Sequence, residues 1–286
     1  MSSTDDVVLA TLDDDGNPSV VDRAMPLIRA DDLAVLRGEG VFETTRAFAG
    51  QSFLLQEHLE RMRASAAQID LQLPEPAQLE ALAGCALDAF GPADAGLRLV
   101  VTKGPENGAG RAFALVSPVS EATIRARADG VATLTLTLGM PASLRPRAPW
   151  LLGGVKSTSY ATAMAALRVT GEREAEAIYL SGDGEVLEAP TASVVAVVDG
   201  MAVTPPPAAV GILPGTTVDF FGDEVVHRPL LTDELRAAPE ILLLSSVRGV
   251  VPVVSLDGTP VGGGRPGPVG RAMARAYEDA VAAVSR

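Results

Sequence analysis

The sequence lacks the residues that build disulfide frameworks, cysteine-rich zinc sites and nucleic-acid surfaces. Cys85 is the one cysteine in 286 residues, so the chain can form no internal disulfide and no zinc site with several thiolates. We expect Cys85 to be a buried structural residue, because free cysteines usually are. Acidic side chains outnumber basic ones, and the formal net charge of −13 argues against nucleic acid as a partner.

Long apolar runs are also missing. The chain has no run of about 18 apolar residues, the length that a membrane-spanning helix needs. Residues 1–6 are polar and acidic, without the basic and apolar regions of a signal peptide. These absences predict a soluble, cytoplasmic protein with no membrane partner.

The composition and length of the chain are typical of a globular protein. Apolar residues make up 47% and charged residues 21%, which is typical of a folded protein rather than a disordered one. Aromatic residues contribute only 4%, so the core must consist largely of Leu, Val and Ala. The length suggests two domains, at about 100–200 residues each.

Residues 1–120 have the pattern of a smaller α+β domain. Apolar residues recur at helical spacing after Leu55, and alternation follows Gly38. This pattern predicts helices over 55–68 and 76–90, and strands over 7–12, 38–48, 97–102 and 112–119. A charged connector is expected at 121–129.

Residues 130–286 have the pattern of a larger domain. Its short strands do not alternate regularly with helices, which predicts an α+β arrangement. A strand-like stretch over 150–152 precedes Lys156, and Pro205, Pro206 and Pro207 force a loop. The expected strands span 131–138, 177–180, 186–187, 194–198, 202–203, 241–244 and 250–254, and the helices 160–170, 216–221 and 269–284.

Lys156 is the first candidate for chemistry. The chain has two lysines, Lys103 and Lys156, since arginine supplies its other positive charges. Small residues surround Lys156 and would allow a ligand to approach closely. A partly desolvated lysine has a lowered pKa and becomes a nucleophilic amine. Physics alone leaves an ordinary surface lysine as the commoner explanation.

Two segments could bind a phosphate. Gly211 to Thr217 runs into an expected helix, where hydroxyls and unpaired backbone N–H groups suit an anion. Ser245 and Ser246 follow an apolar strand and could add further contacts. Taken singly, each segment is better explained by an ordinary helix cap or strand end. His58 and Arg61 share one helix face, so an inward Arg61 could also bind phosphate.

Six motifs in order resemble the class IV (fold-type IV) pyridoxal-phosphate enzymes, over about residues 25–260. They are Arg37 to Arg46, which resembles the opening signature; His58-Leu-Glu-Arg61; Lys156 with Tyr160; Glu188; Leu213 to Thr217; and Ser245-Ser246. The resemblance implies a two-domain fold with pyridoxal 5′-phosphate at the domain interface, and a homodimer.

The resemblance also implies roles for single residues. Lys156 would form the Schiff base and move protons at the substrate, and Tyr160 would hydrogen-bond the phenolic oxygen of the cofactor. Glu188 would keep the pyridine nitrogen protonated. The phosphate would be held by Arg61, Thr216, Thr217 and Ser246. Ser193, Val218 and the Ser245-Ser246 pair depart from residues common in the family, which affects the phosphate contacts most.

Thr44 points to one reaction within the family. Branched-chain aminotransferases usually have glycine there, whereas aminodeoxychorismate lyases usually have threonine. The resemblance is greatest to actinobacterial lyases that convert 4-amino-4-deoxychorismate to 4-aminobenzoate and pyruvate, a folate step. We expect Thr44 to be catalytic, through its hydroxyl. The resemblance implies an amino-acid-like substrate with carboxylates, for which the candidate cations are Arg46, Arg98, Lys103 and Arg248.

Two other functions remain open. An aminotransferase for branched-chain or D-amino acids would share every cofactor residue. A scaffold of the same fold without cofactor could bind a small acidic ligand or a partner chain, but such a protein has no need of both Lys156 and Glu188.

Overall fold

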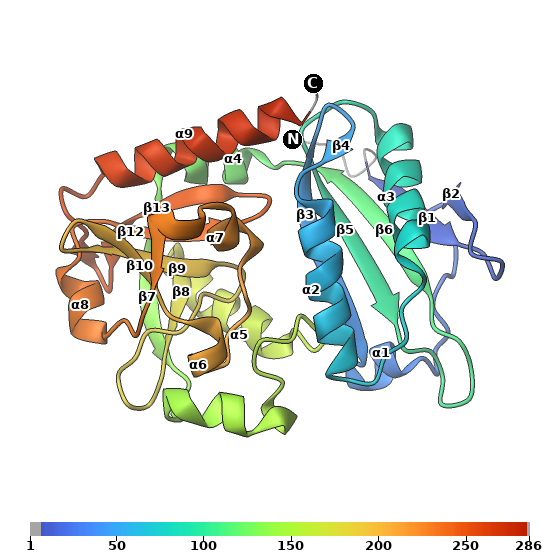
Figure 1. The fold of residues 1–286 in the computed structure, drawn as a ribbon, viewed down its shortest axis with the longest axis horizontal. Helices are drawn as coiled ribbons and strands as arrows, with labels where there is room; N and C mark the ends of the chain where they lie inside the picture. The colour runs from blue at the N-terminus through green and yellow to red at the C-terminus, as the bar shows by residue number, and fades with distance from the viewer. Residues whose placement is uncertain (1–6, 285–286) are drawn as a thin grey trace. The chain divides into compact units, whose positions relative to one another are not determined.

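The computed structural model describes residues 7–284, and the polar stretch expected at residues 1–6 lies outside this range. The chain folds as two compact units. Within the described range, the first comprises residues 7–120, 155–160 and 279–284, and the second residues 121–154 and 161–278. Figure 1 shows the course of the chain through its helices and strands.

The first unit is built on an antiparallel six-stranded sheet in the order β2-β1-β6-β5-β3-β4. The long central strand β3 pairs with β5 over eight residues, from Gly40 opposite Thr102 to Ala47 opposite Ala95. The strands are β1 Val8–Leu12, β2 Pro18–Val21, β3 Gly40–Phe48, β4 Gln51–Ser52, β5 Ala95–Thr102 and β6 Ala112–Pro118.

Helices α2 (Leu55–Ala67) and α3 (Pro76–Phe90) pack on this sheet (Figure 1). Their apolar faces bury Leu59, Met62 and Leu82 against the strands. The predicted bounds of both helices are confirmed to within one residue. Cys85 is half-buried and packs against this core, so it is less enclosed than expected.

The second unit contains an eight-stranded mixed sheet in the order β11-β10-β9-β12-β13-β7-β8, with β14 paired to β13. Strand β7 runs parallel to both β8 and β13, whereas β12 is antiparallel to both β9 and β13. The strands are β7 Val131–Thr137, β8 Ala175–Leu180, β9 Ser193–Val198, β10 Met201–Thr204, β11 Val225–His227, β12 Ile241–Ser245, β13 Gly249–Leu256 and β14 Thr259–Pro260.

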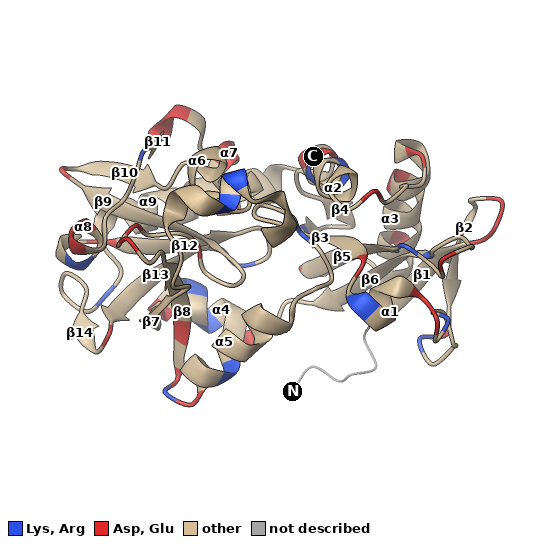
Figure 2. Ribbon diagram, turned by 90° about the horizontal axis from the view of Figure 1, so that it is seen from below, with Lys and Arg blue, Asp and Glu red and all other residues tan. Residues whose placement is uncertain are grey.

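Short helices surround this sheet, and buried Val, Leu and Ala side chains form its core. The α-helices are α4 Glu121–Asp129, α5 Ala161–Gly171, α6 Pro207–Val210, α7 Thr216–Phe220, α8 Thr232–Ala237 and α9 Pro268–Ala283; the 3₁₀ turns are η2 Ala142–Arg147, η3 Pro149–Leu151 and η4 Gly222–Glu224. In Figure 2 the ribbon positions of acidic and basic residues are scattered through both units, and they do not form one basic stripe. Among residues 7–284, no helix combines the length and the apolar character needed to cross a bilayer.

Several segments differ from their predicted structure. The strand expected at 186–187 is only an isolated bridge, between Val186 and Leu180. The expected connector 121–129 is the helix α4, in which an Arg125–Glu121 pair spans one turn and Ala126 packs on the second core. The strand expected at 150–152 is the turn η3, because Pro149 fixes the backbone φ of its first residue and Leu152 ends it with φ of 51°. Helix α1 (Leu33–Arg37) buries no side chain and therefore has no amphipathic signal.

Candidate active site

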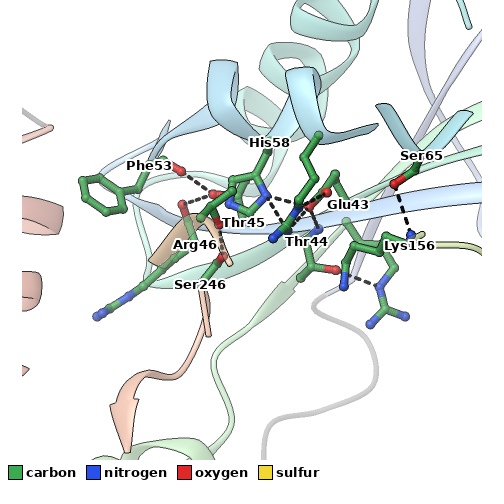
Figure 3. Close-up of polar contacts among 12 residues, drawn as sticks. Glu43, Thr44, Thr45, Arg46, Phe53, His58, Ser65, Lys156 and Ser246 are labelled. Atoms are coloured by element: carbon green, nitrogen blue, oxygen red, sulfur yellow. Dashed lines mark hydrogen bonds and ion pairs between the residues drawn. The ribbon is translucent and has the colours of Figure 1, made fainter. Parts of the chain in front are cut away.

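Residues 155–160, which include Lys156, belong to the first unit. The sequence pattern instead predicts them within the larger domain, residues 130–286. This segment adds a short bridge beside β3, with Ser157 opposite Val41. The Phe42 N–H donates to the Lys156 carbonyl at 3.1 Å, and the Lys156 N–H donates to Ser65 Oγ of α2 at 3.1 Å (Figure 3). Both backbone groups of Lys156 are thus fixed by neighbouring elements.

Side chains predicted to be functional gather around Phe42. Lys156 Nζ lies 4.5 Å from the centre of the Phe42 ring, and the Tyr160 ring meets that ring edge-on at 5.4 Å. Thr44, two residues along β3 and so on the same face, stands directly opposite Arg98 of β5. Arg98 Nε donates to Thr44 Oγ1 at 3.4 Å, and its guanidinium lies 5.4 Å from the Phe42 ring centre.

The other face of β3 carries a residue that the sequence reading did not single out. Glu43, which Figure 3 shows beside His58, is 1% exposed. Its carboxylate accepts hydrogen bonds from Arg61 Nε and Nη2 of α2, each at 2.7 Å. His58 Nδ1 lies 2.6 Å from Glu43 Oε2. A carboxylate within an apolar strand, followed by the His-x-x-Arg helix, is the signal that could have revealed this cluster, since buried charges need partners.

The pKa of Glu43 reflects a competition. Burial raises it, but the hydrogen bonds and charges of Arg61 and His58 outweigh burial and hold the pKa at about 2, below its usual 4.5. The carboxylate is therefore ionised throughout the physiological range.

Glu188 lies in the second unit with its carboxylate oriented by two groups. Oε2 accepts from the Leu213 N–H at 3.2 Å, and Oε1 lies 3.7 Å from Arg145 Nη1. Gly211 has a left-handed backbone, and a Cβ there would meet Arg145 Cβ at 2.6 Å, so a glycine allows Arg145 to run past the loop.

The two predicted phosphate-binding segments lie together in the second unit. Thr216 and Thr217 are buried in the first turn of α7, and Thr216 Oγ1 lies 3.2 Å from Ser246 Oγ. The Tyr277 hydroxyl donates to the Ser246 carbonyl at 2.7 Å and fixes the turn. A Cβ at position 215 would come within 2.3 Å of Ser193 Oγ, so Gly215 leaves room for this hydroxyl in its present position.

The four candidate substrate cations differ in their partners. Arg46 forms a two-point pair with Asp94, Lys103 pairs with Glu39, and Arg248 pairs with Glu176. A carboxylate thus compensates each of these three charges. Arg98 has no carboxylate partner among residues 7–284, which makes it the strongest candidate of the four.

The donor set fits pyridoxal 5′-phosphate in chemical type. Lys156 offers an amine for the aldehyde, Tyr160 a phenol for the phenolic oxygen, and Glu188 a carboxylate for the pyridine nitrogen. Arg61, Thr216, Thr217 and Ser246 offer the cation and hydroxyls that a phosphate requires.

Sequence comparisons agree with this chemistry. The profile of the family Amino-transferase class IV matches residues 40–256. A bifunctional aminodeoxychorismate lyase / D-amino acid transaminase of Mycobacterium tuberculosis is 38% identical over 258 residues, covering 84% of this chain and 89% of that protein. A D-alanine aminotransferase of Bacillus licheniformis is 27% identical over 281 residues, covering 93% and 95%.

Solved structures match over nearly the whole length. The PLP-bound form of a hypothetical aminotransferase from Mycobacterium tuberculosis has 35% identity and a TM-score of 0.88, covering 97% of this chain and 99% of that one. A fold IV transaminase of Curtobacterium pusillum has 31% identity and a TM-score of 0.85, covering 98% and 97%. The predicted fold and the predicted cofactor of the family are confirmed. This chain belongs to the class IV aminotransferases, the pyridoxal-phosphate-dependent family of aminotransferases and lyases.

Proposed function

We propose that this protein is a 4-amino-4-deoxychorismate lyase, which forms 4-aminobenzoate and releases pyruvate. The observation that carries the proposal is Thr44, which lies beside Arg98 on the face of β3 where Lys156 meets Phe42. The 38% identical mycobacterial relative, named for this lyase activity among its two, supports the same reaction.

The reaction needs a proton to move between two carbons. The proton leaves the amine-bearing ring carbon, the bond from the ring to the enolpyruvyl oxygen breaks with its electron pair going to that oxygen, and the released enolate takes up a proton on its methylene carbon to become pyruvate. The cofactor supplies an electron sink for this elimination. Lys156 is the base and acid that we assign to these proton transfers, because its backbone is fixed on both sides by Phe42 and Ser65.

The remaining residues bind and orient. Glu188, held by Leu213 and Arg145, would keep the pyridine nitrogen protonated, and Tyr160 would bind the phenolic oxygen. Thr216, Thr217 and Ser246 would bind the phosphate together with Arg61. Arg98 would bind a substrate carboxylate, and the Thr44 hydroxyl would act beside it on the leaving group.

A D-amino-acid aminotransferase is the second candidate. Its supporting observation is that curated relatives with this activity cover most of the chain, the mycobacterial bifunctional protein included. An archaeal putative branched-chain aminotransferase is 28% identical over 282 residues, so that substrate class is also represented. All would use the same cofactor residues, and substrate contacts alone would distinguish them.

A paired turnover assay tests the proposal. The protein receives 4-amino-4-deoxychorismate, and 4-aminobenzoate and pyruvate are quantified; in parallel, D-alanine or leucine with 2-oxoglutarate is assayed for glutamate. Equal amounts of aminobenzoate and pyruvate support the lyase, with or without glutamate in the second assay. Glutamate without aminobenzoate contradicts the lyase proposal and identifies a transaminase. The homodimer and the cytoplasmic location stay predictions.

A further inference from the structure

Glu43 has no part in the roles assigned above, although it is the most deeply buried carboxylate of this site. Its side chain is 2% exposed, and it lies on the face of β3 that packs against α2. Arg61 approaches it with two nitrogens of one guanidinium edge, each at 2.7 Å, and His58 approaches Oε2 at 2.6 Å (Figure 3). The polar side chains of Glu43, Arg61 and His58 thus contact one another between β3 and α2, where the neighbouring side chains are apolar.

Stability alone does not account for such a cluster. Removing charges from water is costly, and well-packed apolar residues in place of a buried ion pair are often neutral or stabilising. What the pair does provide is geometry, because a planar guanidinium bound through Nε and Nη2 to both oxygens of one carboxylate has a single orientation. His58 fixes the carboxylate in turn, and its Nδ1 also lies 3.4 Å from Arg61 Nη2.

We propose that Glu43, supported by His58, is a positioning residue that holds Arg61 in the orientation in which it binds the cofactor phosphate. The proposal rests on the phosphate role given to Arg61 under the proposed function. An arginine that is already ordered loses little side-chain entropy on binding, so its contribution to cofactor affinity is retained. Glu43 itself touches neither phosphate nor substrate in this account.

The test compares two ligands that differ only in the phosphate. Dissociation constants of pyridoxal 5′-phosphate and of pyridoxal are measured by absorbance titration of the cofactor-free protein. Glu43→Gln keeps the shape but loses the charge and the two-oxygen clamp. We expect the dissociation constant of pyridoxal 5′-phosphate to rise about tenfold and that of pyridoxal less than about twofold, since preorganisation of Arg61 serves the phosphate alone. Glu60→Gln, an exposed neighbour of Arg61 on α2, is the matched control and should change neither.

Further variants separate the positioning role of Glu43 from the phosphate-binding role of Arg61. Arg61→Gln should also raise the dissociation constant of pyridoxal 5′-phosphate selectively. The double variant with Glu43→Gln should bind pyridoxal 5′-phosphate no more weakly than Arg61→Gln alone. If Arg61→Gln has no selective effect, the phosphate role of Arg61 is wrong and the present proposal falls with it. Suppose instead that Arg61→Gln selectively weakens the binding of pyridoxal 5′-phosphate. If Glu43→Gln then binds pyridoxal 5′-phosphate like the unaltered protein, or weakens the binding of both ligands equally, only the positioning role of Glu43 is wrong.

His58→Leu covers the case in which Glu43→Gln does not fold. It removes the His58 contact with Glu43 and leaves the pair with Arg61. We expect a selective rise of about threefold in the dissociation constant of pyridoxal 5′-phosphate, because the carboxylate loses its contact with His58 and keeps both contacts with Arg61. An unchanged ratio of the two dissociation constants would overturn the proposal.

Discussion

At the scale of single residues, Glu43 makes stability depend on acid. The pKa of Glu43 is about 2 in the folded protein, against an ordinary value of 4.5 that applies to the unfolded chain. The contribution of Glu43 to the free energy of unfolding is therefore complete above pH 4.5 and disappears as the pH falls towards 2. The difference corresponds to about 3 kcal/mol of unfolding free energy. Urea unfolding at several pH values should therefore show a smaller loss on acidification for Glu43→Gln than for the unaltered protein. Parallel pH curves for the two proteins would contradict this assignment.

Thr44 gives a second prediction at this scale. If its hydroxyl acts on the leaving group, Thr44→Val should lower the lyase kcat about 10²-fold, the size of a lost proton transfer. Thr44→Ser keeps the hydroxyl and should retain most activity. Both variants should bind the cofactor normally, because Thr44 contacts Arg98 and none of the assigned cofactor residues. Equal activity of the Val and Ser variants would remove Thr44 from the chemistry.

At the scale of helices and strands, the periodicity of apolar residues predicts the elements that are amphipathic. The helices α2 and α3 and the strands β3 and β5 were expected within a few residues, because each buries one face. Helices α1 and α4 bury no residue completely, so the sequence carries no periodic signal for them. The turn η3 depends on Pro149 and on the left-handed Leu152, which local apolar character does not reveal.

The loop that precedes α7 gives the prediction at this scale. Gly211 has φ of +65°, and a Cβ would lie 2.6 Å from Arg145 Cβ. Gly211→Ala should lower the unfolding free energy by about 1–3 kcal/mol, through backbone strain and displacement of Arg145. Gly171→Ala is the control, because no atom lies within 4 Å of its added Cβ and its φ is not positive. Denaturant unfolding of both variants measures the difference, and equal stabilities would show that the loop accommodates the side chain.

At the scale of the whole molecule, the order of motifs predicts the family, but not how each unit is assembled. The sequence indicates Lys156, Glu188 and the phosphate-binding segments from resemblance. It does not show that residues 155–160 join the first unit, since this follows from backbone pairing with Val41 and Phe42, far away in the sequence. Glu43 was missed for the same reason, because its partners lie on a separate helix.

Lys156, one of two lysines in the chain, is the residue to which the cofactor is assigned, and every other role in the site follows from that assignment. Protein loaded with pyridoxal 5′-phosphate is reduced with borohydride, which fixes the bond between the cofactor and the lysine amine, and peptides are mapped by mass spectrometry. We expect the pyridoxyl group on Lys156, its loss in Lys156→Ala and its retention in Lys103→Ala, as the assignment of the cofactor to Lys156 requires. A pyridoxyl group on Lys103, or a visible absorbance band that survives in Lys156→Ala, would contradict it.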